Sequence, residues 1–229
     1  MKAMVFSDLI TARNSFGTLL GITLFVSAFI AVGTDTLIAA VACMGAMVPF
    51  MYLFSISAYD EQGGWEQFRL TLPLTRRQVA YGRYASMLAV TGCTTVLALA
   101  AGLLIGAVAG ALPAGMVSEG LLLGVTTPEM LAVAVVAVDL IILLSAAVTL
   151  PLIMRFGMTK GTRLVPVVML LALSAVAGLL GTGVDAIGLD AVLTSGNIMA
   201  VMAVAAVVTL ALYGASALLA AQLYERREI

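Results

Sequence analysis

Six long apolar runs constrain this chain more than any other feature of its sequence. They occupy residues 16–32, 37–58, 84–109, 130–153, 164–180 and 198–221. A helix needs about 20 mostly apolar residues to cross a bilayer, whereas a membrane β-strand needs about 10 residues of alternating polarity. The runs show no such alternation, and a helix satisfies its own backbone hydrogen bonds within lipid. The sequence therefore predicts an all-α, polytopic integral membrane protein with six transmembrane helices.

Composition excludes a soluble protein and argues against most enzymes. Hydrophobic residues make up 62% of the 229 residues and charged residues only 10%, while a soluble domain is about 45–50% apolar and about 25% charged. The segments between the runs are too short for a second domain, so we expect one transmembrane domain over residues 1–229. The chain has no histidine, the commonest general acid or base. Cys43 and Cys93 lie in apolar runs, so we expect small core residues rather than a disulfide or a metal site.

The charged residues sort by the side of the membrane on which they fall. Cytoplasmic segments of membrane proteins carry an excess of Lys and Arg. If the chain crosses six times, all 11 basic residues fall on the side of the two termini. The opposite side holds Asp35, Glu119, Glu129, Asp185 and Asp190 and no basic residue. We therefore expect both termini in the cytoplasm.

Residues 1–15 precede the first run. Val5, Phe6, Leu9 and Ile10 fall on one face of a helix, which predicts an interfacial helix along the inner leaflet. A plain extension of the first transmembrane helix is an equally good interpretation. Only a few residues separate the first two runs, so we expect a tight helical hairpin there rather than a cleaved signal peptide.

The loop between the second and third runs, residues 59–83, is the most informative polar segment. A glycine pair near its start breaks the second helix. After the glycines, Trp65, Phe68 and Leu72 fall at positions i, i+3 and i+7 and form one apolar face of about two turns. The spacing predicts a short helix that lies roughly parallel to the membrane.

The second half of this loop contains a helix start signal. Pro73 disfavours helix at Leu72, and Thr75 with Gln78 has the spacing of a capping box. The third transmembrane helix is therefore predicted to begin there. The short helix before it is either an amphipathic turn with aromatic side chains at the lipid headgroups or a docking helix for a cytoplasmic partner.

Two polar segments carry a distinctive pattern. They read DEQGGWEQFRLTLPLTRRQVAYGRY at residues 60–84 and PLIMRFGMTKGTR at residues 151–163. In the first, an acidic stretch precedes a bulky helix, then a leucine-proline pair and a basic residue before a tyrosine. In the second, a proline precedes a basic residue, a phenylalanine, a glycine and a basic tail. Together with the six-helix layout, these segments resemble ABC-2 type transporter permeases of the small single-domain kind.

The resemblance implies a permease in the cytoplasmic (inner) membrane of a bacterium. Its implied partners are a separate ATP-binding cassette (ABC) ATPase, a second permease (an identical copy or a paralogue), the lipid bilayer and the substrate, with no nucleic acid. The chain contains no GxxxxGKS or GxxxxGKT phosphate loop. We therefore expect that it is not itself an enzyme and holds no cofactor, while ATP and Mg²⁺ bind to the partner ATPase.

The same resemblance implies that the loop at residues 59–83 carries a cytoplasmic coupling helix between the second and third transmembrane helices. This helix and its exit would contact the ATPase and transmit its closure. The implied contact residues are Trp65, Glu66, Phe68, Arg69, Leu72, Pro73, Thr75 and Arg76.

Asp139 lies near the middle of the fourth run, where a charged side chain costs about 2.5–3.5 kcal/mol on insertion scales. One interpretation is functional: the carboxylate faces the translocation path or another polar group. The other is a protonated carboxyl that hydrogen-bonds a neighbouring hydroxyl and joins two helices. The residues alone leave both open.

Glycines recur at every fourth position in two runs. Gly102, Gly106 and Gly110 do so in the third run, and Gly17 with Gly21 in the first. Such faces let helix backbones approach closely, so we expect them to pack helices within one subunit. A position at the seam between two permeases is the alternative.

Three classes of function remain. An ABC exporter permease for an amphipathic or hydrophobic substrate (a peptide, an antimicrobial or a drug-like molecule) fits the loop and the resemblance. A stand-alone secondary transporter or channel would use Asp139. A membrane-embedded enzyme needs at least two cooperating polar groups at one depth, and the runs offer only one ionisable group. The exporter is therefore the leading hypothesis.

Overall fold

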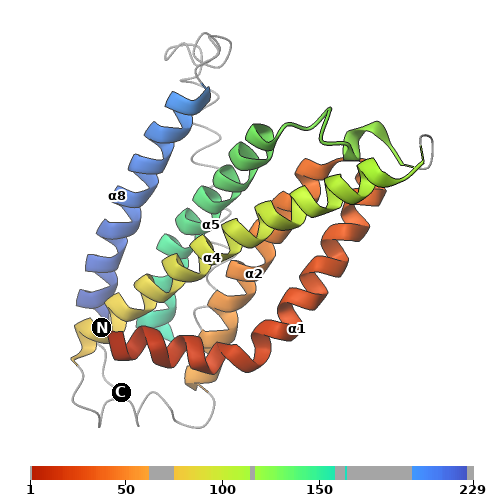
Figure 1. The fold of residues 1–229 in the computed structure, drawn as a ribbon. Coiled ribbons are helices and arrows are strands. Elements are labelled where there is room, and N and C mark those ends of the chain that lie inside the picture. The colour runs from red at the N-terminus through yellow and green to blue at the C-terminus, as the bar shows by residue number, and fades with distance from the viewer. Residues whose placement is uncertain (1, 62–74, 114–116, 158–162, 164–197, 226–229) are drawn as a thin grey trace. The chain divides into compact units, whose positions relative to one another are not determined.

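The computed structural model describes residues 2–61, 75–113, 117–157, 163 and 198–225. Every regular element in these ranges is helical (Figure 1). The elements are α1 (Lys2–Thr34), α2 (Leu37–Glu61), α4 (Arg76–Ala111), the 3-10 turn η2 (Glu119–Leu121), α5 (Pro128–Phe156) and α8 (Ile198–Glu225). The all-α prediction is therefore confirmed for the described residues.

Five of these helices are long and apolar enough to cross a membrane. They are α1, α2, α4, α5 and α8, and they contain the apolar runs predicted at 16–32, 37–58, 84–109, 130–153 and 198–221. The sixth predicted run, at 164–180, and the short helix predicted in the loop at 59–83 lie outside the described residues. The count of six helices therefore stays a prediction.

The chain divides into two compact units. The first contains residues 1–56 and 82–142, and the second contains residues 57–81 and 143–229. In the first unit, Val41 of α2 and Leu131 of α5 belong to a buried cluster that includes alanines of α4. Small residues on α4 bring these helices together, because a Cβ atom on Gly102 would overlap the Val41 side chain. The prediction of close helix packing is confirmed here and at Gly106, where a Cβ would lie 3.1 Å from Leu37 of α2.

Of the expectations about small residues, one about glycines stays a prediction and one about a cysteine is wrong. At Gly17, Gly21 and Gly110 no described atom lies within 4 Å of the position that a Cβ would take, so the described part of the chain gives no close packing at these three glycines. Cys93 is exposed on α4, whereas Cys43 on α2 is half-buried. Cys93 is not a core residue because a transmembrane helix turns part of its apolar surface toward lipid.

The connection between α1 and α2 is a tight hairpin, as predicted. α1 ends at Thr34 and α2 begins at Leu37. Between them Asp35 has a φ of 54°, a left-handed conformation that Asp adopts more readily than most residues. Gly120 packs against the Asp35 carbonyl oxygen, where a Cβ would have no room. Glu119 belongs to the same turn as Gly120. The segments that contain Asp35 and Glu119, both expected on one side of the membrane, therefore lie together.

α1 is one continuous helix, but its first part lies at an angle to the rest (Figure 1). In this first part Phe6 and Ile10 are exposed, while Asp8 between them is buried. The interpretation of residues 1–15 as an extension of the first transmembrane helix is thus confirmed for the described residues. Their placement along the inner leaflet stays a prediction.

In the second unit, α8 packs on the C-terminal half of α5. The Ser216 hydroxyl of α8 donates a hydrogen bond to the carbonyl oxygen of Ala147 on α5. Tyr213, Ala217 and Tyr224 of α8 are buried, at a spacing that places them on one helical stripe. This stripe ends close to the last residue of α8.

Candidate functional site

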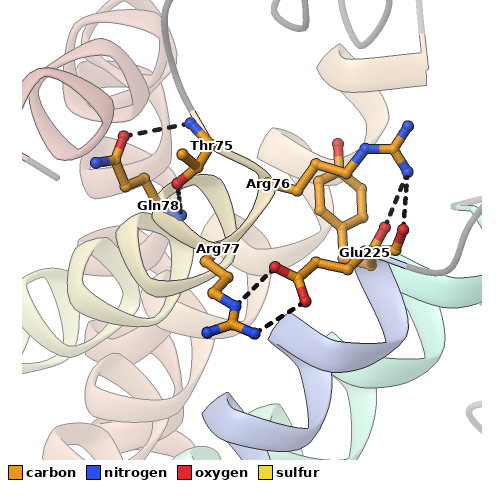
Figure 2. A network of polar contacts seen from close by, with 6 residues as sticks. Thr75, Arg76, Arg77, Gln78 and Glu225 are labelled. Atoms are coloured by element: carbon orange, nitrogen blue, oxygen red, sulfur yellow. Dashed lines mark hydrogen bonds and ion pairs between the residues drawn. The ribbon is translucent and has the colours of Figure 1, made fainter.

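The residues predicted to contact a partner fall at the edge of the described structure. Six of them lie outside it: Trp65, Glu66, Phe68, Arg69, Leu72 and Pro73. The other two, Thr75 and Arg76, lie at the start of α4, which meets the C-terminal end of α8 (Figure 2). We call this meeting point the loop-exit junction. It consists of Thr75, Arg76, Arg77, Gln78, Tyr224 and Glu225.

A reciprocal capping box starts α4. The backbone N–H of Gln78 donates to Thr75 Oγ1 at 3.3 Å, and the backbone N–H of Thr75 donates to Gln78 Oε1 at 3.3 Å (Figure 2). These bonds satisfy N–H groups that the first turn of a helix leaves without partners. The predicted start of the third transmembrane helix is confirmed, and residues 76–83 at the end of the 59–83 segment already belong to α4.

Arg76 binds the last carbonyl groups of α8. Its Nη1 donates to the carbonyl oxygens of Tyr224 and Glu225, at 3.3 Å in each case (Figure 2). The last carbonyl groups of a helix have no intrahelical donor, and a cation is favoured there because the C-terminus of a helix carries partial negative charge. In the structure, therefore, Arg76 fastens the end of α8 to the start of α4. Its predicted contact with an ATPase stays a prediction.

Arg77 and Glu225 form a two-pronged ion pair. Arg77 Nε lies 2.6 Å from Glu225 Oε1, and Arg77 Nη2 lies 3.2 Å from Oε2 (Figure 2). The two side chains are 62% and 39% exposed, so water and salt screen their attraction. The fork geometry fixes the direction of both side chains. The pair therefore contributes more to the alignment of the two helix ends than to stability.

Sequence reasoning missed the α8 half of this junction. In the sequence, Arg77 is one of several basic residues expected on the cytoplasmic side, and Glu225 lies 148 positions away from it. Helical pairs are recognisable at spacings of three or four residues, and no such spacing connects these two. The sequence indicates the contact only weakly: two arginines begin α4 and Glu225 ends α8, so their charges are opposite.

Asp139 lies on α5 and exposes only 8% of its surface. Its Oδ2 accepts a hydrogen bond from Thr95 Oγ1 of α4 at 2.6 Å. Its Oδ1 is buried and has no hydrogen-bond partner among the described residues, and Gly45 of α2 lies close to it. The Thr95 bond fits the interpretation that the carboxyl joins two helices. The second oxygen remains able to bind another polar group, so a role on the translocation path stays a prediction.

A second polar cluster lies in the first unit, and no sequence pattern predicts it. Asp8 Oδ2 of α1 lies 3.6 Å from Arg83 Nε of α4 and 3.3 Å from the Ser86 hydroxyl, which donates to it. All three side chains are buried. The sequence shows Arg83 only as one more cytoplasmic charge, and no spacing pairs it with Asp8.

The loop-exit junction, Asp139 and the Asp8 cluster each form hydrogen bonds or ion pairs between helices. Within the ranges that the structure describes, no group of three or more His, Cys, Asp and Glu side chains could hold a metal ion. The loop-exit junction ties together two helix ends, the Asp8 cluster ties α1 to α4, and Asp139 ties α5 to α4. This arrangement suits the transmission of movement between helices.

Comparison with known proteins identifies the family. The family model for "ABC-2 family transporter protein" matches residues 3–225, which is nearly the whole chain. No match was found among curated proteins or among solved structures. The membrane-crossing helices and the family match agree on a multi-pass membrane protein. The chain belongs to the ABC-2 family of transporter proteins and has a role in membrane transport.

Proposed function

We propose that this chain is the transmembrane permease subunit of an ABC exporter. The observation that carries the proposal is the family match over residues 3–225, because the family implies pairing with an ABC ATPase. In this proposal ATP and Mg²⁺ bind to the partner, and the permease spans the cytoplasmic (inner) membrane of a bacterium with both termini inside. If the chain crosses the membrane six times, all 11 basic residues fall on one side, which supports that orientation.

The coupling element in this proposal is the loop at residues 59–83. Its short helix, with Trp65, Phe68 and Leu72, docks in a groove of the ATPase. The loop-exit junction supports this role, because the loop leads into the capped start of α4 and Arg76 fastens that start to α8. A push on the loop therefore moves two transmembrane helices together. ATP-driven closure of the ATPases thus shifts the permease between inward-open and outward-open states.

The proposed substrate is amphipathic or hydrophobic: a peptide, an antimicrobial or a drug-like molecule. Support comes from the composition, since only 10% of the residues are charged and a strongly polar substrate needs polar groups along its path. Two permeases, identical or paralogous, form the path between them. Large apolar side chains are exposed in the described structure on α1, at Phe25 and Phe29, and on α8, at Val204 and Val207. These faces are suited to contact lipid or a second permease.

Co-expression with a neighbouring ABC ATPase tests the proposal. We expect the two proteins to co-purify and the permease to stimulate ATP hydrolysis. Phe68→Asp or Leu72→Asp places a charge on the docking face and should abolish the stimulation. Leu112→Asp is the matched control, because it makes the same change at an exposed position beyond the other end of α4. Failure to associate with any ATPase, or full stimulation by both loop variants, contradicts the proposal.

Asp139 supports a second candidate, a stand-alone secondary transporter or channel. The observation is its buried Oδ1, which has no partner in the described part of the chain, because ionisable groups inside membrane spans often mark substrate or ion paths. This candidate expects transport in proteoliposomes that contain the permease alone, abolished by Asp139→Asn. Glu129→Gln, at an exposed position on the same helix, is the control. Transport that requires an ATPase rules this candidate out.

A further inference from the structure

A buried ion pair joins the first part of α1, residues 2–14, to α4. Asp8 exposes 3% of its surface and Arg83 exposes 5%, and Arg83 Nε lies 3.6 Å from Asp8 Oδ2. A buried pair adds little net stability compared with apolar residues of the same size, because the desolvation of both charges offsets their attraction. What such a pair supplies is a fixed register between the elements that carry it.

Ser86 makes the contact directional. Its Oγ lies 3.3 Å from Asp8 Oδ2 and 2.9 Å from the carbonyl oxygen of Arg83. Arg83 and Ser86 are neighbours on one face of α4, because residues three apart in a helix lie side by side. α4 therefore places a cation, the Arg83 guanidinium, and a hydroxyl, that of Ser86, next to one carboxylate oxygen of α1. The single Ser86 hydrogen is shared between that oxygen and the Arg83 carbonyl oxygen. A slide or rotation of either helix separates these groups from the Asp8 oxygen.

The first part of α1 turns the Asp8 side chain inward. Phe6 and Ile10, two positions before and after it, are exposed. The stretch thus shows apolar side chains to its surroundings and a carboxylate to α4. Asp8 is placed so that this stretch follows α4 when α4 moves.

α4 connects this contact to the loop-exit junction. The helix begins at Arg76 and continues without a break to Ala111, and Arg83 lies about two turns from its start. A displacement applied at the start of α4 therefore reaches Arg83 along one continuous helix. The ion pair then links α4 to the first part of α1.

We propose that Asp8 and Arg83 are a positioning pair that makes the first part of α1 follow α4 during the transport cycle. The proposal rests on the proposed function, because the loop that would move α4 is the loop assigned to the ATPase. In this scheme neither residue touches the substrate or the ATPase. Both act through the positions of their helices.

The first test needs no ATPase. Amide hydrogen exchange is measured on the full-length permease in lipid nanodiscs. Asp8→Asn removes the charge at nearly constant size, and we expect exchange across residues 2–14 to become about fivefold faster or more, with α8 unchanged. Glu129→Gln, which alters an exposed acid, should leave residues 2–14 as in the wild type. Unchanged exchange in the Asp8→Asn protein overturns the proposal whatever the ATPase does.

The second test separates positioning from stability in the complex with the ATPase. Each single variant, Asp8→Asn or Arg83→Met, removes one charge of the buried pair and leaves the opposite charge buried without it, so either variant can lose transport through misfolding. The double variant Asp8→Asn/Arg83→Met removes both charges and should unfold near the wild-type temperature. We expect it to hydrolyse ATP but to transport about fivefold less substrate, or lower still, per ATP. A double variant that recovers both its unfolding temperature and its transport overturns the positioning role.

The two tests distinguish the two possible failures. If the wild-type permease associates with no ATPase, the proposed function fails, and the exchange experiment still decides whether Asp8 and Arg83 hold the first part of α1. If the complex forms and works but the exchange of residues 2–14 is unaffected by Asp8→Asn, the positioning pair alone is wrong.

Discussion

At the residue scale, two glycines of α4 form a natural comparison. A Cβ on Gly102 would overlap the side chain of Val41, whereas a Cβ on Gly110 would meet no described atom within 4 Å. Both residues lie in the same helix, so one substitution has opposite packing consequences at the two positions. The contact between α2 and α4 thus depends on a missing methyl group at Gly102.

We expect Gly102→Ala to lower the free energy of unfolding by about 1–3 kcal/mol, the usual cost of overpacking a core. The added methyl group must displace Val41 or separate α4 from α2. Gly110→Ala should be neutral or stabilising by up to about 1 kcal/mol, because alanine favours helix. Unfolding of the purified permease in detergent measures both. Equal effects of the two substitutions would contradict this account of the contact.

At the element scale, α4 and α5 both begin with a threonine cap. Thr75 Oγ1 accepts a hydrogen bond from the Gln78 N–H, and Thr127 Oγ1 accepts one from the Met130 N–H at 3.3 Å. The first cap lies at the exit of the loop at residues 59–83, and the second belongs to the start of a different helix. A comparison of substitutions at Thr75 and Thr127 therefore distinguishes an effect on helix stability from an effect on coupling.

Thr75→Ala and Thr127→Ala should each cost about 1 kcal/mol of stability, the usual loss of an N-cap. We expect Thr75→Ala alone to lower the amount of substrate transported per ATP hydrolysed, because the first turn of α4 frays where the loop acts on it. Transport and ATP hydrolysis are measured in the same proteoliposomes with the ATPase present. A loss of coupling in both variants, or in neither, would show that the cap at the loop exit has no special role.

At the scale of the whole molecule, the distribution of basic residues predicts the orientation in the membrane. With the native cysteines replaced by alanine, Thr36→Cys in the α1–α2 turn should react with a membrane-impermeant maleimide in intact cells. Arg155→Cys at the end of α5 should react only after the cells are permeabilised, because basic segments stay in the cytoplasm. Both positions are exposed. Labelling of Arg155→Cys in intact cells would invert the proposed topology.

The sequence predicts local features of this fold well and distant contacts poorly. The five described spans, the α1–α2 hairpin and the capping box each depend on residues a few positions apart, so their patterns can be read directly. The ion pair of Asp8 and Arg83 is different, because no local spacing selects one of the 11 basic residues as the partner of Asp8. The sequence likewise does not identify Thr95 as the partner of Asp139, because the two residues lie on different helices.

The length of α4 bears on where a partner can reach the permease. At about 1.5 Å per residue, its 36 residues extend for about 54 Å, while the hydrocarbon core of a bilayer is about 30 Å thick. The helix is therefore longer than the lipid tails are thick, and we expect its polar first turns to extend beyond the tails. A partner protein that binds these turns need not contact lipid. A tilt of the helix caused by that partner would then also move the far end of α4, on the opposite side of the membrane.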